Sequence, residues 1–286
     1  MFTNCDIAAS RRMEIREPAT RFAFGKNWQR FLRALDEERI AKAEDSLCTM
    51  LEVENLKGKS FLDVGCGSGL FSLAAMRKGA ARVHSFDYDP QSVACAQELK
   101  HCYFRDANFW TIQQGDALDS SYLSTLGKFD IVYSWGVLHH TGNLWRGLEN
   151  VIPLVAQDGK LFIAVYNDQG SFSNIWKAVK HRYNRGTPWR VLLVPAFGSY
   201  FVGKALIRDI LVSHKNPLAR YRRDKQSRGM AFWTGLLDWL GGYPFEVAKP
   251  EAIFDFFRTR GFELVRLSTA GGGHGNNEFV FVKRGE

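Results

Sequence analysis

The sequence of 286 residues lacks the marks of secreted, membrane-spanning and zinc-binding proteins. Its five cysteines form no C-x-x-C pair and no zinc-ligand spacing, which speaks against a disulfide framework and a zinc site. No stretch reaches the roughly 18 apolar residues of a membrane-spanning helix. The first ten residues include Asp6 and have no apolar core, so no signal peptide is predicted. We therefore expect a cytoplasmic protein that holds no metal.

Glycine is concentrated in the most informative segment, Phe61 to Gly69, whose sequence is FLDVGCGSG. A short apolar run leads into this loop, and a helical pattern from Leu70 to Lys78 follows it. The third glycine comes one residue too early for the dinucleotide fingerprint G-x-G-x-x-G. A carboxylate before the loop, Asp63, disfavours phosphate and favours a ligand with an ammonium or sulfonium group. The loop alone is also compatible with an ordinary strand-to-helix turn.

Four further strands are predicted after the loop, each separated from the next by a helical segment. They span residues 81–86, 111–116, 129–134 and 159–166. This alternation predicts an α/β fold with a doubly wound parallel sheet, in which ligands bind at the carboxyl ends of the strands. Asp87, Asp116 and the pair His139–His140 fall at such ends. Asp87 follows Gly69 by 18 residues, close to the interval of roughly 20 at which an acid reaches a ribose diol.

From Lys59 to Tyr166 the sequence resembles the class I S-adenosylmethionine-dependent methyltransferases. The resemblance depends on five strings in order: LDVGCGSG, FDYDP, QGDALD, FDIVYSWGVLHHTG and GKLFIAVY. They are most similar to the small-molecule branch that includes ubiquinone-pathway O-methyltransferases. The resemblance implies a seven-stranded, mainly parallel, Rossmann-like sheet with an N-terminal helical segment and a helical lid insertion after the fifth strand. Its last two strands would form an antiparallel hairpin near the C-terminus.

The same resemblance implies S-adenosyl-L-methionine as the cofactor and gives each part of it a set of residues. The glycine loop would approach the methionyl part, with Asp63 near its ammonium group. Asp87 would bind the ribose hydroxyls, while Tyr88 and Asp116 would contact the adenine. The expected cofactor-binding residues are Asp63, Gly65, Cys66, Gly67, Gly69, Asp87, Tyr88, Asp116, Ala117, Ser134 and Trp135.

Four segments are expected along the chain. Residues 1–55 form an N-terminal helical segment, with one long helix from about Gln29 to Leu51, and residues 56–166 form the cofactor-binding core. Residues 167–245 form a basic, aromatic helical lid, because they are far too many for an ordinary loop. Helices are expected there at 174–182, 204–213 and 229–240, with an apolar connection at 189–202. Residues 246–286 supply the last helix and the hairpin that completes the core.

The positive charge of the chain is concentrated in the lid. Between Lys177 and Arg228 there are thirteen Lys or Arg residues and two Asp. Three interpretations are open: a solvated basic surface, a clamp for an anionic substrate, or a patch that contacts anionic lipid at the membrane periphery. Nucleic acid is the least favoured partner, because no RNA-binding module is present. The sequence does not indicate an oligomeric state.

The expected reaction is methyl transfer to a small or lipid-linked molecule, with a hydroxyl oxygen as the acceptor. A hydroxyl must lose its proton, and histidine is suited to accept it at neutral pH. His140 is the first candidate for this base, followed by His139 and then Tyr166. A small-molecule N-methyltransferase and a non-catalytic module that only binds the cofactor are the alternatives.

Several residues outside the core are candidates for contact with the methyl acceptor. The segment before the first long helix contains Phe24, Asn27 and Trp28, and a glycine-rich stretch lies between the two C-terminal strands. Polar side chains in such loops can face the lid. The expected substrate residues are Trp28, Asn167, Asp168, Tyr243, His274, Asn276 and Asn277.

Overall fold

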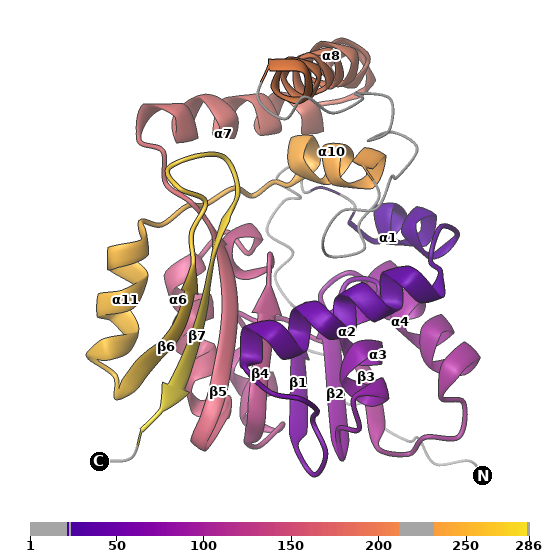
Figure 1. The fold of residues 1–286 in the computed structure, drawn as a ribbon, viewed down its shortest axis with the longest axis vertical. Helices are drawn as coiled ribbons and strands as arrows, with labels where there is room; N and C mark the ends of the chain where they lie inside the picture. Colours follow the sequence, from indigo (N-terminus) through magenta and orange to yellow (C-terminus); the bar gives the residue numbers. More distant parts are fainter. Residues whose placement is uncertain (1–21, 23, 212–231, 285–286) are drawn as a thin grey trace, which may run out of the picture.

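The computed structural model describes residue 22, residues 24–211 and residues 232–284. A seven-stranded sheet with strand order β3-β2-β1-β4-β5-β7-β6 forms its centre (Figure 1). The strands β1 to β5 run parallel, and β7 lies antiparallel between β5 and β6. This is the fold predicted from the sequence. The strands are β1 (Ser60–Val64), β2 (Arg82–Asp87), β3 (Trp110–Gln114), β4 (Phe129–Trp135), β5 (Val155–Tyr166), β6 (Phe262–Ser268) and β7 (Asn276–Lys283).

Helices cover both faces of the sheet because successive strand residues point to opposite sides. Phe61, Tyr133 and Phe162 pack under α2, α3 and α4, whereas their neighbours Leu62 and Val132 pack under α5, α6 and α11. The strands are therefore apolar on both faces, as is usual for a buried parallel sheet. The helices are α2 (Glu37–Leu51), α3 (Leu70–Arg77), α4 (Pro90–Tyr103), α5 (Ser120–Ser124), α6 (Leu144–Val151) and α11 (Pro250–Arg258).

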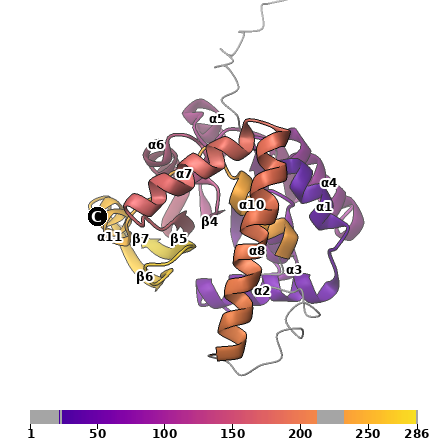
Figure 2. The ribbon, with the colours of Figure 1, turned by 90° about the horizontal axis from the view of Figure 1, so that it is seen from above.

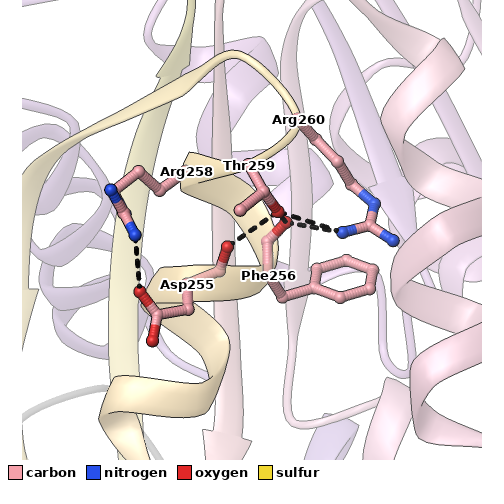
Figure 3. Close-up of polar contacts among 5 residues, drawn as sticks. All are labelled: Asp255, Phe256, Arg258, Thr259 and Arg260. Carbon is pink, nitrogen blue, oxygen red and sulfur yellow. Dashed lines mark hydrogen bonds and ion pairs between the residues drawn. The ribbon is translucent and has the colours of Figure 1, made fainter.

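The C-terminal end of α11 is closed by its own side chains (Figure 3). The Thr259 hydroxyl donates to the Asp255 carbonyl at 2.9 Å, and Arg258 pairs with the Asp255 carboxylate at 3.3 Å. Arg260 donates to the Phe256 carbonyl, stacks over the Phe256 ring at 3.8 Å and pairs with Glu149 of α6 at 3.0 Å. These contacts satisfy carbonyls that a helix end leaves unpaired, and they tie α11 to α6.

The N-terminal region contains two helices where the sequence analysis expected one long helix from Gln29. Helix α1 (Phe24–Leu32) ends before a turn, and α2 then starts after Asp36. The Asp36 carboxylate accepts from the Arg39 backbone N–H at 2.9 Å, which is a standard N-cap. The apolar stripe continues across this break, so periodicity alone did not show it.

Three helices of the lid lie above the carboxyl ends of the strands (Figures 1 and 2): α7 (Ser171–Asn184), α8 (Thr187–Leu211) and α10 (Phe232–Gly241). The connection expected at 189–202 is wrong, because α8 runs through it with Pro195 inside the helix. The start of the helix expected at 229–240 and the end of the one expected at 204–213 lie outside the described residues.

A buried lysine joins α7 to the end of α10. Lys180 of α7 is fully buried, and its ammonium donates to the Trp239 carbonyl in the last turn of α10. The ammonium also lies 4.3 Å from the Trp239 ring centroid, 4.9 Å from that of Phe245 and 5.3 Å from that of Tyr166. One turn later, Asn184 donates to the Gly241 carbonyl at 2.7 Å. A cation and an amide at a helix C-terminus satisfy its carbonyls and favour its dipole.

The cap at Asp36 predicts a measurable loss of stability. Asp36→Ala removes the acceptor for the Arg39 N–H and should lower the free energy of unfolding by about 1 kcal/mol. Urea denaturation followed by circular dichroism measures this change. Asp36→Asn keeps a capping oxygen and is the matched control. Equal losses in both variants would mean that charge, and not the capping bond, stabilises the start of α2.

Candidate functional site

A cavity of about 540 Å³ lies where the carboxyl ends of the central strands meet the lid and α1. Its floor comes from the glycine loop after β1 and the turns after β2, β3 and β4. Aromatic rings from α1, β5 and α10 form much of the rest. The predicted site residues that line it are Trp28, Asp63, Gly65, Cys66, Gly67, Asp87, Tyr88, Asp116, Ala117, Trp135, His140, Tyr166 and Asn276.

The glycine loop approaches its neighbours more closely than any side chain would allow. Gly65 and Gly67 have φ angles of +72° and +56°, which favour glycine. A Cβ on Gly65 would lie 2.3 Å from a Val137 methyl, and one on Gly67 would lie 2.9 Å from the Trp28 ring. Gly69 does not line the cavity: a Cβ there would lie 2.8 Å from the backbone of Ala96 in α4. Its role in this structure is to let the loop pack on α4.

Asp63 is a buried carboxylate at the end of β1 with a chain of hydroxyl partners. It accepts from the Ser72 hydroxyl, which lies 2.7 Å from the Ser85 hydroxyl, and Ser85 in turn accepts from the Trp110 indole at 2.9 Å. Burial raises the pKa of Asp63 to about 7, although the Ser72 bond opposes that rise. A cation bound in the cavity would favour the charged form.

Asp87 at the end of β2 is held by backbone N–H groups. It accepts from Gly67 at 2.9 Å and from Asp89 at 2.8 Å, one bond to each carboxylate oxygen. Burial raises the pKa of Asp87 to about 6, while these two bonds pull it down. Each carboxylate oxygen has a second lone pair, so Asp87 keeps capacity to accept from a ligand diol.

The adenine-side residues predicted from the sequence form the next part of the wall. Asp116 accepts from the Leu118 backbone N–H at 2.8 Å, and it lines the cavity with Ala117 and the half-exposed Tyr88. Cys66 also lines the cavity, from the glycine loop between Gly65 and Gly67. Burial raises the pKa of its thiol well above the ordinary value, so the thiol stays protonated and acts as a small filler.

Helix α1 forms one side of the cavity wall, held by a contact that local sequence patterns do not indicate. The Asp89 carboxylate accepts from the Gly25 N–H at 2.8 Å, and a Cβ on Gly25 would lie 2.4 Å from Gln91. This contact places Phe24 and Trp28 in the cavity wall. Asn27, weighed as a candidate together with them, is buried and does not line the cavity.

Further cavity residues were missed by the sequence analysis. Most are apolar or glycine, so no polar signature in the sequence distinguished them from core residues. They are Phe22, Ser68, Leu70, Phe71, Phe86, Asp89, Pro90, Gly115, Tyr133, Gly136, Val137, Thr141, Trp239 and Gly275.

The two predicted residues at the end of β4 have different positions. Ser134, expected among the cofactor-binding residues, is buried, donates to the Val64 carbonyl at 3.4 Å and does not line the cavity. Successive side chains of a strand point in opposite directions, so Ser134 points away from the cavity that the next residue, Trp135, lines. Trp135 lines the cavity and donates from its indole to Glu278 of β7 at 2.7 Å.

His140 and His139 have opposite environments, although they are adjacent in the short helix η1 (Leu138–His140). The Nδ1 of His140 donates to the Pro244 carbonyl at 2.6 Å, and the ring lines the cavity. Because that bond places the proton on Nδ1, Nε2 of the neutral ring is the basic nitrogen. His139 is fully buried, accepts from the Tyr166 N–H at 3.3 Å and does not line the cavity. Burial lowers the pKa of His139 far below the ordinary value, so it is unsuited to act as the base.

Most of the predicted substrate residues brace the lid and lie outside the cavity wall. Asn167 donates to the Gly273 carbonyl at 3.2 Å and accepts from Asn277 at 3.0 Å, which fixes the glycine-rich hairpin tip. Asp168 accepts from the Gly170 N–H and the Ser173 hydroxyl at the start of α7. Tyr243 packs on His181, with ring centroids 5.4 Å apart, and His274 packs between Trp176 and Trp239. Asn276, in contrast, lines the cavity together with Tyr166 of β5.

Comparison with known proteins agrees with the architecture of this cavity. Residues 62–161 match a family model described as a methyltransferase domain. These residues are a class I, S-adenosylmethionine-dependent methyltransferase domain. They contain the glycine loop, Asp87, Asp116 and both histidines of η1.

Curated relatives match this chain over short stretches. The ribosomal protein L11 methyltransferase of Legionella pneumophila is 40% identical over 79 residues, 27% of each chain. The protein of the same name from Methylococcus capsulatus is 50% identical over 48 residues, 17% of this chain and 16% of that one. This chain thus spans about a quarter or less of the length of these relatives, so their activity does not transfer to it directly.

Solved structures share the fold over most of the chain. Magnesium protoporphyrin IX methyltransferase from Synechocystis, with bound SAH, has a TM-score of 0.52 at 16% identity and covers 90% of this chain and 93% of its own. An O-methyltransferase family protein from Burkholderia thailandensis has a TM-score of 0.51 at 12% identity, over 86% of this chain and 57% of its own. At these identities the likeness shows the fold.

The residues of the cavity fit S-adenosylmethionine. Asp63 lines the cavity together with the backbone of Gly65 and Gly67, so a methionyl group there would lie next to a carboxylate and against bare backbone. Asp87 can still accept hydrogen bonds from a ribose diol. Asp116 lines the part of the cavity where the sequence analysis expected the adenine. Within residues 24–211 and 232–284, no three His, Cys, Asp or Glu side chains form a group that could hold a metal ion.

The glycine at position 67 predicts a steric effect on cofactor binding. Gly67→Ala places a methyl against the Trp28 ring and strains the φ of +56°, so affinity for S-adenosylhomocysteine should fall by about tenfold or more, roughly 1.4 kcal/mol. Isothermal titration calorimetry measures this change. Gly127→Ala carries the same backbone strain, with a φ of +74° and no atom within 4 Å of the added Cβ. It should leave affinity unchanged, and an equal loss there would remove the steric explanation.

The buried carboxylates predict a pH dependence of cofactor affinity. Asp63 and Asp87, with pKa values of about 7 and about 6, must be charged to hold an ammonium group and a diol. Affinity for S-adenosylhomocysteine should therefore rise from pH 5.5 to pH 8 by about tenfold or more and then level off. Calorimetry across this range measures it, with Asp63→Asn expected to flatten the upper part of the curve. A pH-independent affinity in the native protein would contradict the assignment.

Proposed function

We propose that this protein transfers a methyl group from S-adenosylmethionine to a hydroxyl oxygen of a small, largely apolar molecule, with His140 as the general base. The observation that carries the proposal is the His140 geometry: its Nδ1–H is fixed on the Pro244 carbonyl, and its ring lines the cavity. The neutral ring can then accept a proton only at Nε2. Such a base is needed for a hydroxyl acceptor and is not needed for most amines.

In the proposed reaction, one set of residues binds the cofactor and His140 accepts the proton. When bound, S-adenosylmethionine supplies an electrophilic methyl group on a sulfonium that leaves as a neutral thioether. Asp63, Gly65, Gly67 and Asp87 would hold and orient the cofactor. His140 Nε2 would accept the proton of the acceptor hydroxyl, so that the hydroxyl oxygen can take up the methyl group that the cofactor supplies. Holding the two reactants in line accounts for most of the acceleration such a site can give.

The walls of the cavity support an acceptor with an apolar, ring-like body. Phe22, Phe24, Trp28, Tyr166 and Trp239 all line it, and aromatic walls favour flat or prenylated molecules. Thr141 and Asn276 are polar positions in the same wall that can bond a hydroxyl or carbonyl. This composition supports the small-molecule branch, as in ubiquinone-pathway O-methyltransferases, over a protein acceptor. A strongly anionic acceptor has less support, because the described residues that line the cavity include no Lys or Arg.

The proposal predicts that His140 controls turnover and not cofactor binding. His140→Gln keeps a polar side chain but cannot accept the proton, so kcat should fall by about 10²- to 10⁴-fold while S-adenosylhomocysteine affinity stays within about twofold. Release of S-adenosylhomocysteine, measured by mass spectrometry with a panel of hydroxylated aromatic and prenylated phenols, reports turnover. His101→Gln changes an exposed histidine that does not line the cavity and is the matched control.

The same panel separates the alternatives. Turnover with the matched amines and not with the phenols, unaffected by His140→Gln, would support an N-methyltransferase. Tight S-adenosylhomocysteine binding without turnover on any acceptor would support a module that only binds the cofactor. Either result would overturn the proposed role of His140.

A further inference from the structure

The outer face of α8 is an exposed apolar surface that the proposed reaction does not use. Val191 is 69% exposed and Leu192 is 59% exposed, and the neighbouring Trp189 and Tyr200 also face solvent. Seen from above, α8 is the outermost layer of the lid and crosses over α10 (Figure 2). Phe172 and Ile175 in the first turns of α7 are exposed as well.

Helical periodicity explains why this surface forms one face. Leu192, Ala196 and Tyr200 recur at intervals of four and are exposed, while Phe197 and Gly198 turn inward. Phe197 packs on Trp176 of α7 with ring centroids 5.1 Å apart, and Gly198 lies against Leu236 of α10. The inner face of α8 is therefore occupied by the lid core, and Leu192 and Ala196 on its opposite side are exposed.

The exposed charged residues between Ser171 and Tyr200 are all basic. Lys177, Arg182, Arg185 and Arg190 are exposed on α7 and at the start of α8. The sequence from Ser171 to Tyr200 contains no Asp or Glu. Arg190 also packs over the Tyr183 ring, 5.3 Å from its centroid, which holds a positive charge beside Trp189 and Val191. An apolar face bordered by cations, with Trp and Tyr at its ends, matches the chemistry of an anionic bilayer surface.

We propose that α8, with the basic residues of α7, docks on the surface of a membrane that contains anionic lipid. Among the described helices none is long and apolar enough to cross a bilayer, and the proposed mode is a helix lying in the plane of the interface. Val191, Leu192 and Tyr200 enter the headgroup region, while Lys177, Arg182, Arg185 and Arg190 contact anionic headgroups.

Docking there would bring the acceptor cavity close to the lipid surface. α8 packs directly on α10, and α10 supplies Trp239 to the cavity wall. The lid is thus the layer between the proposed membrane contact and the site. An acceptor with an apolar tail could reach the cavity without crossing bulk water. The docking surface itself does not depend on the proposed reaction.

Vesicle cosedimentation of the full chain tests this surface. Binding to phosphatidylcholine vesicles that contain about 30 mol% phosphatidylglycerol is expected, with roughly tenfold weaker binding to pure phosphatidylcholine. Val191→Glu combined with Leu192→Glu should weaken binding by about tenfold or more. Val265→Glu combined with Leu267→Glu changes two exposed apolar residues of the edge strand β6 and is the matched control. Unchanged S-adenosylhomocysteine affinity in each variant shows that the fold is intact.

Three results would overturn the proposal. If the Val191→Glu/Leu192→Glu variant bound anionic vesicles as tightly as the β6 control variant, the α8 face would not contact lipid. Binding that depends on charge alone, abolished by moderate salt and unaffected by the α8 substitutions, would show adsorption of a basic protein. A stable dimer in light scattering that the α8 substitutions dissociate, without vesicle binding, would show that the face is covered by a second copy of the chain.

Discussion

The burial of two carboxylates at the ends of adjacent strands is the constraint on which the site depends. Asp63 and Asp87 sit beside the glycine loop with raised pKa values of about 7 and about 6, because burial disfavours their charge. The folded chain therefore retains protons that the unfolded chain releases above about pH 4, and these two groups make stability fall as pH rises from about 4 to 7. Ser72 and the N–H groups of Gly67 and Asp89 offset part of that cost. A ligand that brings an ammonium group and hydroxyls would offset more of the cost of burying the two charges, and this compensation would contribute to its affinity.

The second constraint is the attachment of the lid to the sheet. Lys180 fixes α7 to the last turn of α10 and to a cluster of rings that includes Tyr166 at the end of β5. The backbone of Phe22 donates to the Tyr243 carbonyl at 3.1 Å, which ties the N-terminal side to the same lid segment. These contacts position the upper wall of the cavity by buried polar and aromatic groups, and such contacts have few alternative arrangements. Most of the residues expected to touch substrate, among them Asn167, Asp168 and Asn277, contribute to this bracing.

The sequence was sufficient for the sheet and the floor of the site, because both depend on local patterns. Strand–helix alternation and the positions of Asp63, Asp87 and Asp116 follow directly from the order of residues. The failures are of a different kind. The division between α1 and α2 depends on one capping bond at Asp36, and the difference between His139 and His140 depends on which ring a distant lid residue, Pro244, contacts. The Asp36 cap is a local signal, but the apolar stripe continues across it. The contact between His140 and Pro244 joins residues 104 positions apart and leaves no trace in local periodicity.

The dependence of His140 on the lid links the two constraints. The carbonyl that accepts from its Nδ1 belongs to Pro244, and Glu246 two residues later accepts from the Leu144 N–H at 3.0 Å and donates its own N–H to His139. The segment after α10 therefore has to be seated on η1 before the basic nitrogen of His140 has a fixed direction. The same arrangement places Trp239 of α10 in the cavity wall. In the proposed reaction, a base whose ring is oriented by the lid would couple proton transfer to the position of the lid.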